Sequence, residues 1–514
     1  MDRKDYKPSC AAVYLNSNDL KYLSENFNRN LWLEFFNRIE KLIPNLPVYI
    51  NINSHLISHC EDLSLKNVKW INNELSELEF LQIVGESLPK SKFNDPDWDE
   101  VCFWYFTGIS PILNIRLTEK SWNRHKQFFS QYSYSENLPS GLIPTTISRE
   151  FLSSLPQKLN TDVHSFFLKN INLYDVDIFF QAPDLRQMRL DFRVNSERSE
   201  ILVNGILQKN PEIEYEEISE FLKQNPDLLR PSPSYIEWEV YHGCELKCTF
   251  CPREFSDLKN DGKFIHVTHF KETLAKMNAH WKSPTTICFG GNGEPLLHPE
   301  FVSLVENSLQ FNKIKEIIIE TALYTNFEAF QQYLLSLSED EKSRISIIVN
   351  LTTLNESTYK NLYGTNHLET IKDRILKLKE TLPLKSLNVQ MIKMVDVESE
   401  IDPYFTYFEK QGINVILQKY NSFAGKLPEK RVSDLTPIHR DFCWHLTRDL
   451  YIKVDGSVSI CKQEQNYILG NIYSEDILKI WQNGLIHFQN SFIGKHELIP
   501  APCLNCDEWY TFNA

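Results

Sequence analysis

At residues 244–251 the chain reads Cys244-Glu245-Leu246-Lys247-Cys248-Thr249-Phe250-Cys251. This C-x3-C-x2-C stretch follows an apolar segment, residues 236–241, that predicts a buried β-strand. Three thiolates on one loop can bind three irons of a cubane cluster, because iron–sulfur clusters take Cys ligands. The fourth iron then has no protein ligand from this loop, and an open coordination position is where a substrate or cofactor binds.

Zinc is the alternative occupant of this loop, because thiolates suit zinc as well as iron–sulfur clusters. A structural zinc site usually shows a fourth Cys or His nearby. His242 precedes Cys244 by only two residues, and we expect the strand to point its ring elsewhere. The spacing therefore favours an iron–sulfur cluster, with zinc kept as the open alternative.

A second motif follows the next predicted strand, residues 286–289, and reads Gly290-Gly291-Asn292-Gly293-Glu294-Pro295. Glycines in such a turn let the backbone approach a ligand that a Cβ atom would block. The carboxylate of Glu294 can accept hydrogen bonds from a cationic amine. A glycine cluster alone more often marks a tight turn, but this one lies one strand after the cysteine loop.

Together the two motifs resemble the radical S-adenosylmethionine (SAM) superfamily. The resemblance implies that Cys244, Cys248 and Cys251 hold a 4Fe–4S cluster whose open iron chelates the amino and carboxylate groups of SAM. An electron from the cluster then cleaves the sulfonium to a 5′-deoxyadenosyl radical, which takes a hydrogen atom from the substrate. The resemblance also implies that the turn contacts SAM, through Gly290, Gly291, Asn292, Gly293 and Glu294.

Two polar residues at predicted strand ends, Glu320 and Asn350, are further candidate SAM contacts. The resemblance places polar contacts to SAM at such positions. Turn formation by strand-end polar groups is an equally good explanation for each of them.

The region from about 235 to 425 alternates short apolar segments with amphipathic stretches such as 368–379 and 404–410. Strand–helix–strand alternation predicts a parallel sheet with right-handed crossovers, whose ligands bind at the carboxyl ends of the strands. We expect an α/β fold with a partial (β/α)6 barrel. Its strands are predicted at residues 236–241, 286–289, 314–319, 345–349, 387–391 and 415–417.

Four further cysteines lie in the last 72 residues: Cys443, Cys461, Cys503 and Cys506. Cys461 follows residues 451–460, which predict a β-hairpin around Asp455-Gly456. Four cysteines brought together can close an all-thiolate site, for which structural zinc is the alternative.

The stretches around these cysteines resemble the SPASM/twitch domain of radical SAM enzymes. The matching stretches are Asp455-Gly456-Ser457-Val458, Leu469-Gly470-Asn471-Ile472 and Ile480-Trp481. The closing residues 503–510 resemble the subgroup called spiro-SPASM proteins. Full SPASM domains carry more cysteines and two auxiliary clusters, so the four here imply one auxiliary 4Fe–4S cluster.

Residues 1–225 predict a separate α/β domain, with strands at 11–15, 48–52 and 103–106 and a helix at 31–42. It resembles the cytidylyltransferase-like, GT-A-type nucleotidyltransferases at residues 11–15, 106–112, 138–142 and 189–191. Asn16-Ser17-Asn18-Asp19 replaces the glycine-rich phosphate loop, and Ser110 stands where an acid would bind metal. Without glycines the loop cannot readily wrap a triphosphate, so we expect a degenerate, non-catalytic domain.

Three prolines between 226 and 233 predict a linker at 226–234. The predicted domains are therefore 1–225, 235–440 for the radical SAM barrel, and 441–514 for the SPASM/twitch region. A chain of 514 residues is expected to form several domains.

The formal net charge of −14 argues against nucleic-acid partners and an anionic-membrane surface. The sequence contains no uninterrupted run of 18 apolar residues, so no transmembrane helix is expected. Residues 1–5 also lack the apolar run of a secretory signal. We therefore expect a cytoplasmic protein, whose 11 cysteines are free thiols or metal ligands rather than disulfides.

The leading hypothesis is a radical SAM oxidoreductase with a peptide or protein substrate and an electron donor such as flavodoxin or ferredoxin, as the resemblance implies. The alternative, from another functional class, is a protein stabilised by structural zinc that binds nucleotide sugars without radical chemistry. A third hypothesis, an active nucleotidyltransferase fused to a radical SAM domain, is disfavoured by the missing glycine loop.

Overall fold

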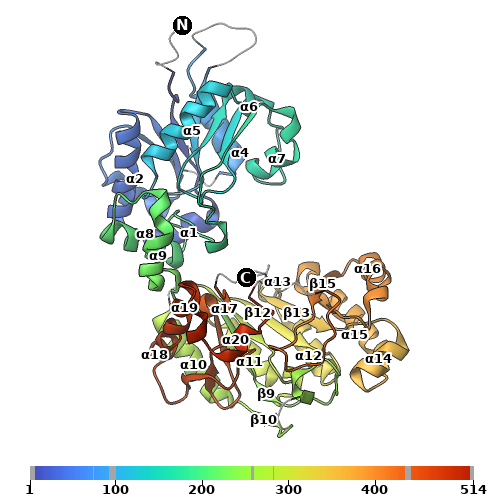
Figure 1. Cartoon of the computed structure of the whole chain (residues 1–514). Helices are drawn as coiled ribbons and strands as arrows, with labels where there is room; N and C mark the ends of the chain where they lie inside the picture. Colours follow the sequence, from blue (N-terminus) through green and yellow to red (C-terminus); the bar gives the residue numbers. More distant parts are fainter. Residues whose placement is uncertain are drawn as a thin grey trace. The chain divides into compact units, whose positions relative to one another are not determined.

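The computed structural model describes residues 6–72, 75–91, 100–255, 260–281, 283–433 and 442–509. The chain divides into two compact units, Met1–Leu228 and Leu229–Ala514, which are considered one at a time (Figure 1). The division falls inside the predicted linker, where Pro226–Leu229 forms a 3-10 turn. The predicted boundary between residues 440 and 441 lies outside the described residues, as does Tyr510 of the closing motif.

The N-terminal unit is built on a seven-stranded mixed sheet. The strands β1, β2, β3 and β4 are parallel, β6 runs antiparallel to both β4 and β5, and β7 is parallel to β5. In sheet order the strands are β3 (Val68–Asn72), β2 (Val48–Ile52), β1 (Ala11–Val13), β4 (Cys102–Phe106), β6 (Thr145–Ser148), β5 (Tyr132–Ser135) and β7 (Val176–Phe179).

Every residue of β1, β2 and β4 is buried, as expected for parallel strands covered on both faces. The strands predicted at 11–15, 48–52 and 103–106 and the helix predicted at 31–42 are confirmed. The helices of this unit are α1 (Ser17–Glu25), α2 (Arg29–Leu42), α3 (Ser54–Glu61), α4 (Glu77–Glu86), α5 (Ile115–Phe128), α6 (Arg149–Ser154), α7 (Val163–Lys169), α8 (Glu197–Lys209) and α9 (Ile218–Gln224).

The second unit contains a nine-stranded sheet in which the six predicted parallel strands lie in consecutive order. This arrangement confirms the partial (β/α)6 barrel. In sheet order the strands are β15 (Asn414–Lys419), β14 (Leu387–Lys393), β13 (Ile345–Asn350), β12 (Ile314–Thr321), β11 (Thr285–Phe289), β8 (Tyr235–Trp238), β16 (Asp449–Ile452), β17 (Ser457–Ser459) and β18 (Ile468–Asn471).

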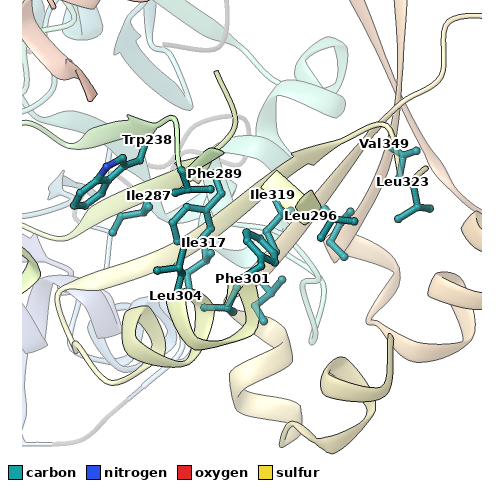
Figure 2. Packing of buried hydrophobic residues seen from close by; sticks show 14 of the residues in the cluster. Trp238, Ile287, Phe289, Leu296, Phe301, Leu304, Ile317, Ile319, Leu323 and Val349 are labelled. Carbon is teal, nitrogen blue, oxygen red and sulfur yellow. The ribbon is translucent and has the colours of Figure 1, made fainter. Parts of the chain in front are cut away.

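Helices cover the outer face of the barrel sheet, because alternate strand residues point outward as an apolar surface. Figure 2 shows Ile287, Phe289, Ile317 and Ile319 of β11 and β12 in the same buried cluster as residues of α11. The helices are α10 (Val267–His280), α11 (Phe301–Leu309), α12 (Phe327–Ser336), α13 (Glu339–Ser343), α14 (Glu356–Tyr363), α15 (Leu368–Thr381) and α16 (Ile401–Lys410).

The intervening strand residues point into the barrel, and this alternation places polar side chains such as Glu237 and Glu320 inside it. The first barrel strand ends at Trp238, and the predicted continuation forms the short β9 (Tyr241–His242). That strand pairs with β10 (Lys263–Phe264). The loop that follows β9 begins at Gly243 and carries the three cysteines.

The predicted hairpin around Asp455-Gly456 is confirmed as the antiparallel pair β16 and β17. Unexpectedly, β16 also pairs in parallel with β8, so the cysteine-rich region continues the barrel sheet. Its helices are α17 (His445–Arg448), α18 (Ile477–Asn483), α19 (Leu485–Phe492) and α20 (Ala501–Leu504). No helix in the described part of the chain has both the length and the apolar character that a membrane crossing requires.

Candidate functional site

The cysteine loop is tied to the end of α14 by backbone hydrogen bonds. The amide of Thr249 donates to the carbonyl oxygen of Leu362 at 2.9 Å. Phe250 packs edge-on against Tyr363, with ring centroids 5.4 Å apart. The aromatic residue before the third cysteine therefore orients the loop.

All three thiols of this loop are half-buried. Burial, together with the nearby Glu294 carboxylate and Cys251 thiol, raises the pKa of Cys244 to about 12, against the lowering effects of the Leu246 amide and Arg253. A metal that binds here must displace these protons, because only the thiolate is a ligand. The loop thus presents three sulfur donors next to the predicted SAM-contacting turn.

The glycine turn packs directly on the chain that leads into the cysteine loop. A Cβ atom on Gly293 would lie 1.7 Å from the carbonyl oxygen of Tyr241, so no other residue fits. The amide of Glu294 donates to the carbonyl oxygen of Gly243 at 2.8 Å. These contacts hold the turn one residue away from Cys244.

Glu294 is buried and bonded to the end of β12. Its carboxylate accepts hydrogen bonds from Thr321 Oγ1 at 2.6 Å and from the amide of Ala322 at 2.9 Å. Burial raises its pKa. Glu294 therefore braces strand β12 against the turn, while its role toward the SAM amino group stays a prediction. A carboxylate has about four acceptor sites, which leaves capacity for a ligand.

Asn292 connects three parts of the barrel unit. Its amide donates to Glu239 Oε2 at 3.3 Å, and Arg253 Nη1 donates to its carbonyl oxygen at 3.1 Å. Its side-chain amide donates to Gln465 Oε1 at 2.7 Å, in the C-terminal region. A direct contact between this side chain and SAM, as predicted, would compete with that bond.

The two strand-end candidates differ in their surroundings. Glu320 lies beside the turn, because a Cβ atom on Gly290 would be 3.4 Å from Glu320 Oε2. Asn350 accepts a hydrogen bond from Gln390 Nε2 at 2.7 Å on the neighbouring strand. Both roles toward SAM stay predictions, and the geometry favours Glu320.

Inside the barrel, an ion pair that sequence reasoning missed joins Lys462 Nζ to Glu237 Oε1 at 3.0 Å. Burial by itself would lower the pKa of Lys462, but the carboxylates of Glu237 and Glu320 outweigh burial and raise it. One signal was available, because Glu237 interrupts an apolar strand at an inward-facing position. Its partner Lys462 lies more than 200 residues further along the chain, directly after Cys461. No local sequence pattern indicated that Lys462 would be buried in the barrel.

The second cysteine set converges on one cavity of about 460 Å³. Burial raises the pKa of Cys443, and the thiols of Cys506, Cys461 and Cys503 raise it further, so the four sulfurs lie near one another. Four sulfur donors on one cavity fit a four-iron cluster, which takes Cys ligands. Among the described residues, no group of three or more His, Cys, Asp or Glu side chains is spaced to hold a single metal ion.

In the N-terminal unit, the replaced phosphate loop is closed by its own side chains. Asn16 Oδ1 accepts from the amides of Asn18 and Asp19 at 2.9 and 3.0 Å, and Asp19 Oδ2 accepts from the amide of Asn16 at 3.2 Å. The Asp19 carboxylate is buried at the start of α1. The amides of Asn18 and Asp19 are therefore already bonded and are not available to a phosphate at this helix N-terminus.

A cavity of about 810 Å³ lies at the carboxyl ends of β4 and β5 in the same unit. Ser110, where the resemblance would require an acid, is buried in its wall. Among the described residues that line it, Arg193 carries the only formal charge, and Asp191 neutralises it at 2.7 Å. The cavity lining therefore offers no carboxylate for a divalent cation.

The comparisons with known proteins agree with this geometry. Residues 238–401 match the family model of the radical SAM superfamily, and residues 443–507 match SPASM, an iron–sulfur cluster-binding domain. These two matches show an iron–sulfur enzyme of the SAM-dependent radical class. The chain carries a radical SAM domain followed by a SPASM domain, whose cofactors are a 4Fe–4S cluster with SAM and auxiliary iron–sulfur.

An uncharacterized protein of Treponema pallidum (strain Nichols) is 24% identical over 355 residues, which cover 67% of this chain and 96% of that protein. The structure of Streptococcus suis SuiB bound to the precursor peptide SuiA is 16% identical with a TM-score of 0.41, covering 67% of this chain and 82% of SuiB. A cytidylyltransferase from Leptospira borgpetersenii is 11% identical with a TM-score of 0.35, covering 43% of this chain and 97% of that chain.

Proposed function

We propose that Cys244, Cys248 and Cys251 hold the SAM-binding cluster of this radical SAM enzyme. The observation that carries the proposal is the close packing of the glycine turn on the chain that leads into the cysteine loop. At this contact Gly293 packs against the carbonyl oxygen of Tyr241. With SAM bound, such a cluster supplies the electron that cleaves the sulfonium to a 5′-deoxyadenosyl radical. The chain's own residues then hold SAM and substrate at the carboxyl ends of the strands.

We also propose that Cys443, Cys461, Cys503 and Cys506 hold one auxiliary 4Fe–4S cluster, which accepts an electron from the substrate or positions it. Four thiols on one cavity support full ligation by protein. The alternative of a zinc staple is disfavoured, because the domain that matches here is an iron–sulfur cluster-binding domain.

A peptide or protein is the proposed substrate, and flavodoxin or ferredoxin is the proposed electron donor. The substrate proposal rests on the resemblance to SPASM enzymes, which often modify peptides. The donor proposal rests on chemistry, because reductive cleavage of SAM consumes an electron from outside the chain.

The test is anaerobic purification with iron and sulfide, followed by reduction in the presence of SAM. We expect 5′-deoxyadenosine and about eight irons per chain, the content of two cubane clusters. Replacing Cys244, Cys248 and Cys251 with Ala should halve the iron and abolish 5′-deoxyadenosine. Replacing Cys503 and Cys506 should halve the iron by removing the other cluster.

The matched control is Cys60→Ala, a buried cysteine of the N-terminal unit, which should keep all the iron. Zinc with negligible iron, or no SAM cleavage by the reconstituted wild type, would contradict the proposal.

For the N-terminal unit we propose a role without nucleotidyl transfer. The buried Asp19 carboxylate at the start of α1 and the lack of acids in the cavity lining support this proposal. Pyrophosphate release from CTP or UTP by the full chain would overturn it.

A further inference from the structure

Three hydrogen bonds connect the residues next to the two cysteine sites. Arg253, two residues after Cys251, donates to the carbonyl oxygen of Asn292 at 3.1 Å. The Asn292 side chain donates to Gln465 Oε1 at 2.7 Å, and Gln465 Nε2 donates to the carbonyl oxygen of Lys462 at 3.0 Å. Lys462 directly follows Cys461 in the chain.

The same two regions are joined a second time through Glu239 of the β8–β9 connection. Glu239 Oε2 accepts from the amide of Asn292 at 3.3 Å and from the hydroxyl of Tyr451 at 3.0 Å. Tyr451 belongs to β16, the strand that carries the hairpin leading to Cys461. The glycine turn is therefore joined to the C-terminal region twice, directly through Gln465 and indirectly through Glu239, which also accepts from Tyr451.

The two bonds of Glu239 are buried, whereas the three bonds through Arg253, Asn292 and Gln465 are partly buried. Asn292 is 7% exposed and Glu239 is 1% exposed. A Cβ atom on Gly291 would lie 2.9 Å from the Tyr451 hydroxyl, so the turn lies directly on β16. Hydrogen bonds are stronger in such low-dielectric surroundings, and an unpaired partner is costly.

We propose that the bridge Arg253–Asn292–Gln465 is a positioning device, which sets the SAM-contacting turn by its attachment to the auxiliary cysteine loop. This proposal rests on the proposed function, in which the two cysteine sets hold the two clusters. An ordered loop at Cys461 holds Gln465 in place, and Gln465 holds the turn at the geometry that SAM requires. Asn292 acts through the turn and is a positioning residue, not a catalytic one.

The first experiment measures SAM binding to the oxidised holoenzyme by anaerobic equilibrium dialysis. The SAM-induced change in the EPR spectrum of the cluster is recorded separately, on samples frozen directly after reduction. Asn292→Leu and Gln465→Leu should each weaken SAM binding about tenfold, which corresponds to about 1.4 kcal/mol for the loss of this partly buried hydrogen bond. Iron content should stay at the wild-type value, because neither residue is a ligand.

The swap Asn292→Gln with Gln465→Asn tests the bridge itself, because it keeps the summed length of the two side chains. It should bind SAM within about threefold of wild type, a value that allows for imperfect geometry. Asn483→Leu is the matched control. It removes one bond of 2.8 Å, to the carbonyl oxygen of Leu469, from the same C-terminal region, and should leave SAM binding unchanged.

The second experiment is a double-mutant cycle with the variant in which Cys503 and Cys506 are replaced by Ala. Removing the auxiliary ligands should weaken SAM binding when Asn292 is present. The same change should cause little further loss of SAM affinity in the Asn292→Leu variant, because the effects of coupled residues are not additive. Fully additive effects, or a swap no better than the single variants, overturn the proposal. Failure of the proposed function would appear separately, as wild-type protein without iron or without SAM cleavage.

Discussion

The individual residues of the site owe their roles to sterics as much as to ligand chemistry. Gly290 and Gly293 lie in the same turn, yet only Gly293 has a backbone carbonyl in the space of a side chain. The three cysteines depend on that contact, because it holds the turn beside their loop.

Gly293→Ala should destabilise the barrel unit by about 3 kcal/mol, because its methyl group would meet the Tyr241 carbonyl and force a backbone shift. Gly290→Ala is the matched control, since its methyl group would make only ordinary contacts of 3.4 Å or more. Urea denaturation of both variants measures the difference, and equal stability of the two would contradict the argument.

Buried His125 should make the N-terminal unit less stable in mild acid. Burial lowers its pKa to about 4, and its Nδ1 atom lies 2.8 Å from Ser133 Oγ. Between pH 6.5 and 4 the unfolded chain binds the proton and the folded chain does not, so stability is complete above pH 6.5 and falls as pH decreases.

The loss should reach about 3 kcal/mol near pH 4. Denaturant midpoints from pH 4 to 8 check it, with His125→Gln expected to flatten the profile. An unchanged slope in that variant would assign the pH dependence to other groups.

At the scale of elements, Arg230 fastens the C-terminal helices to the start of the barrel. Its buried guanidinium donates to the carbonyl oxygens of Leu446 at 2.7 Å and Trp481 at 2.5 Å, and lies 3.5 Å from the centre of the Trp481 ring. Burial lowers its pKa to about 9. Helices α17 and α18 therefore each bind the same buried cation through a backbone carbonyl oxygen.

Arg230→Ala should destabilise this unit by about 3 kcal/mol, because the Leu446 and Trp481 carbonyl oxygens each lose a charged donor and a large buried side chain leaves a void. Lys377→Ala removes an exposed ion pair with Asp373 and should change stability by less than about 1 kcal/mol. Thermal unfolding followed by circular dichroism compares the two variants. A small effect of Arg230→Ala would show that the helices are held by apolar packing.

At the scale of the whole molecule, the chain consists of two compact units that each have their own sheet and core. Both proposed clusters belong to the second unit. A ligand that binds only the folded form stabilises the unit that contains it.

Iron removal should therefore lower one thermal transition and leave the other in place. Calorimetry of the reconstituted and chelator-treated chain should show two transitions, of which only one shifts. The His125→Gln variant identifies the unshifted one as the N-terminal unit. A single transition that moves as a whole would show that the units unfold together.

Sequence patterns were sufficient wherever neighbours along the chain decide the structure. The C-x3-C-x2-C spacing, the glycine turn, the six barrel strands and the Asp455-Gly456 hairpin are all local, because strand alternation and turn chemistry act over a few residues. Long-range contacts had no such signature. The pairing of β16 with β8, the Lys462–Glu237 ion pair and the Asn292–Gln465 bond join residues 170 to 230 positions apart. Only the folded chain brings these partners together, because each partner is chosen by the packing of the barrel.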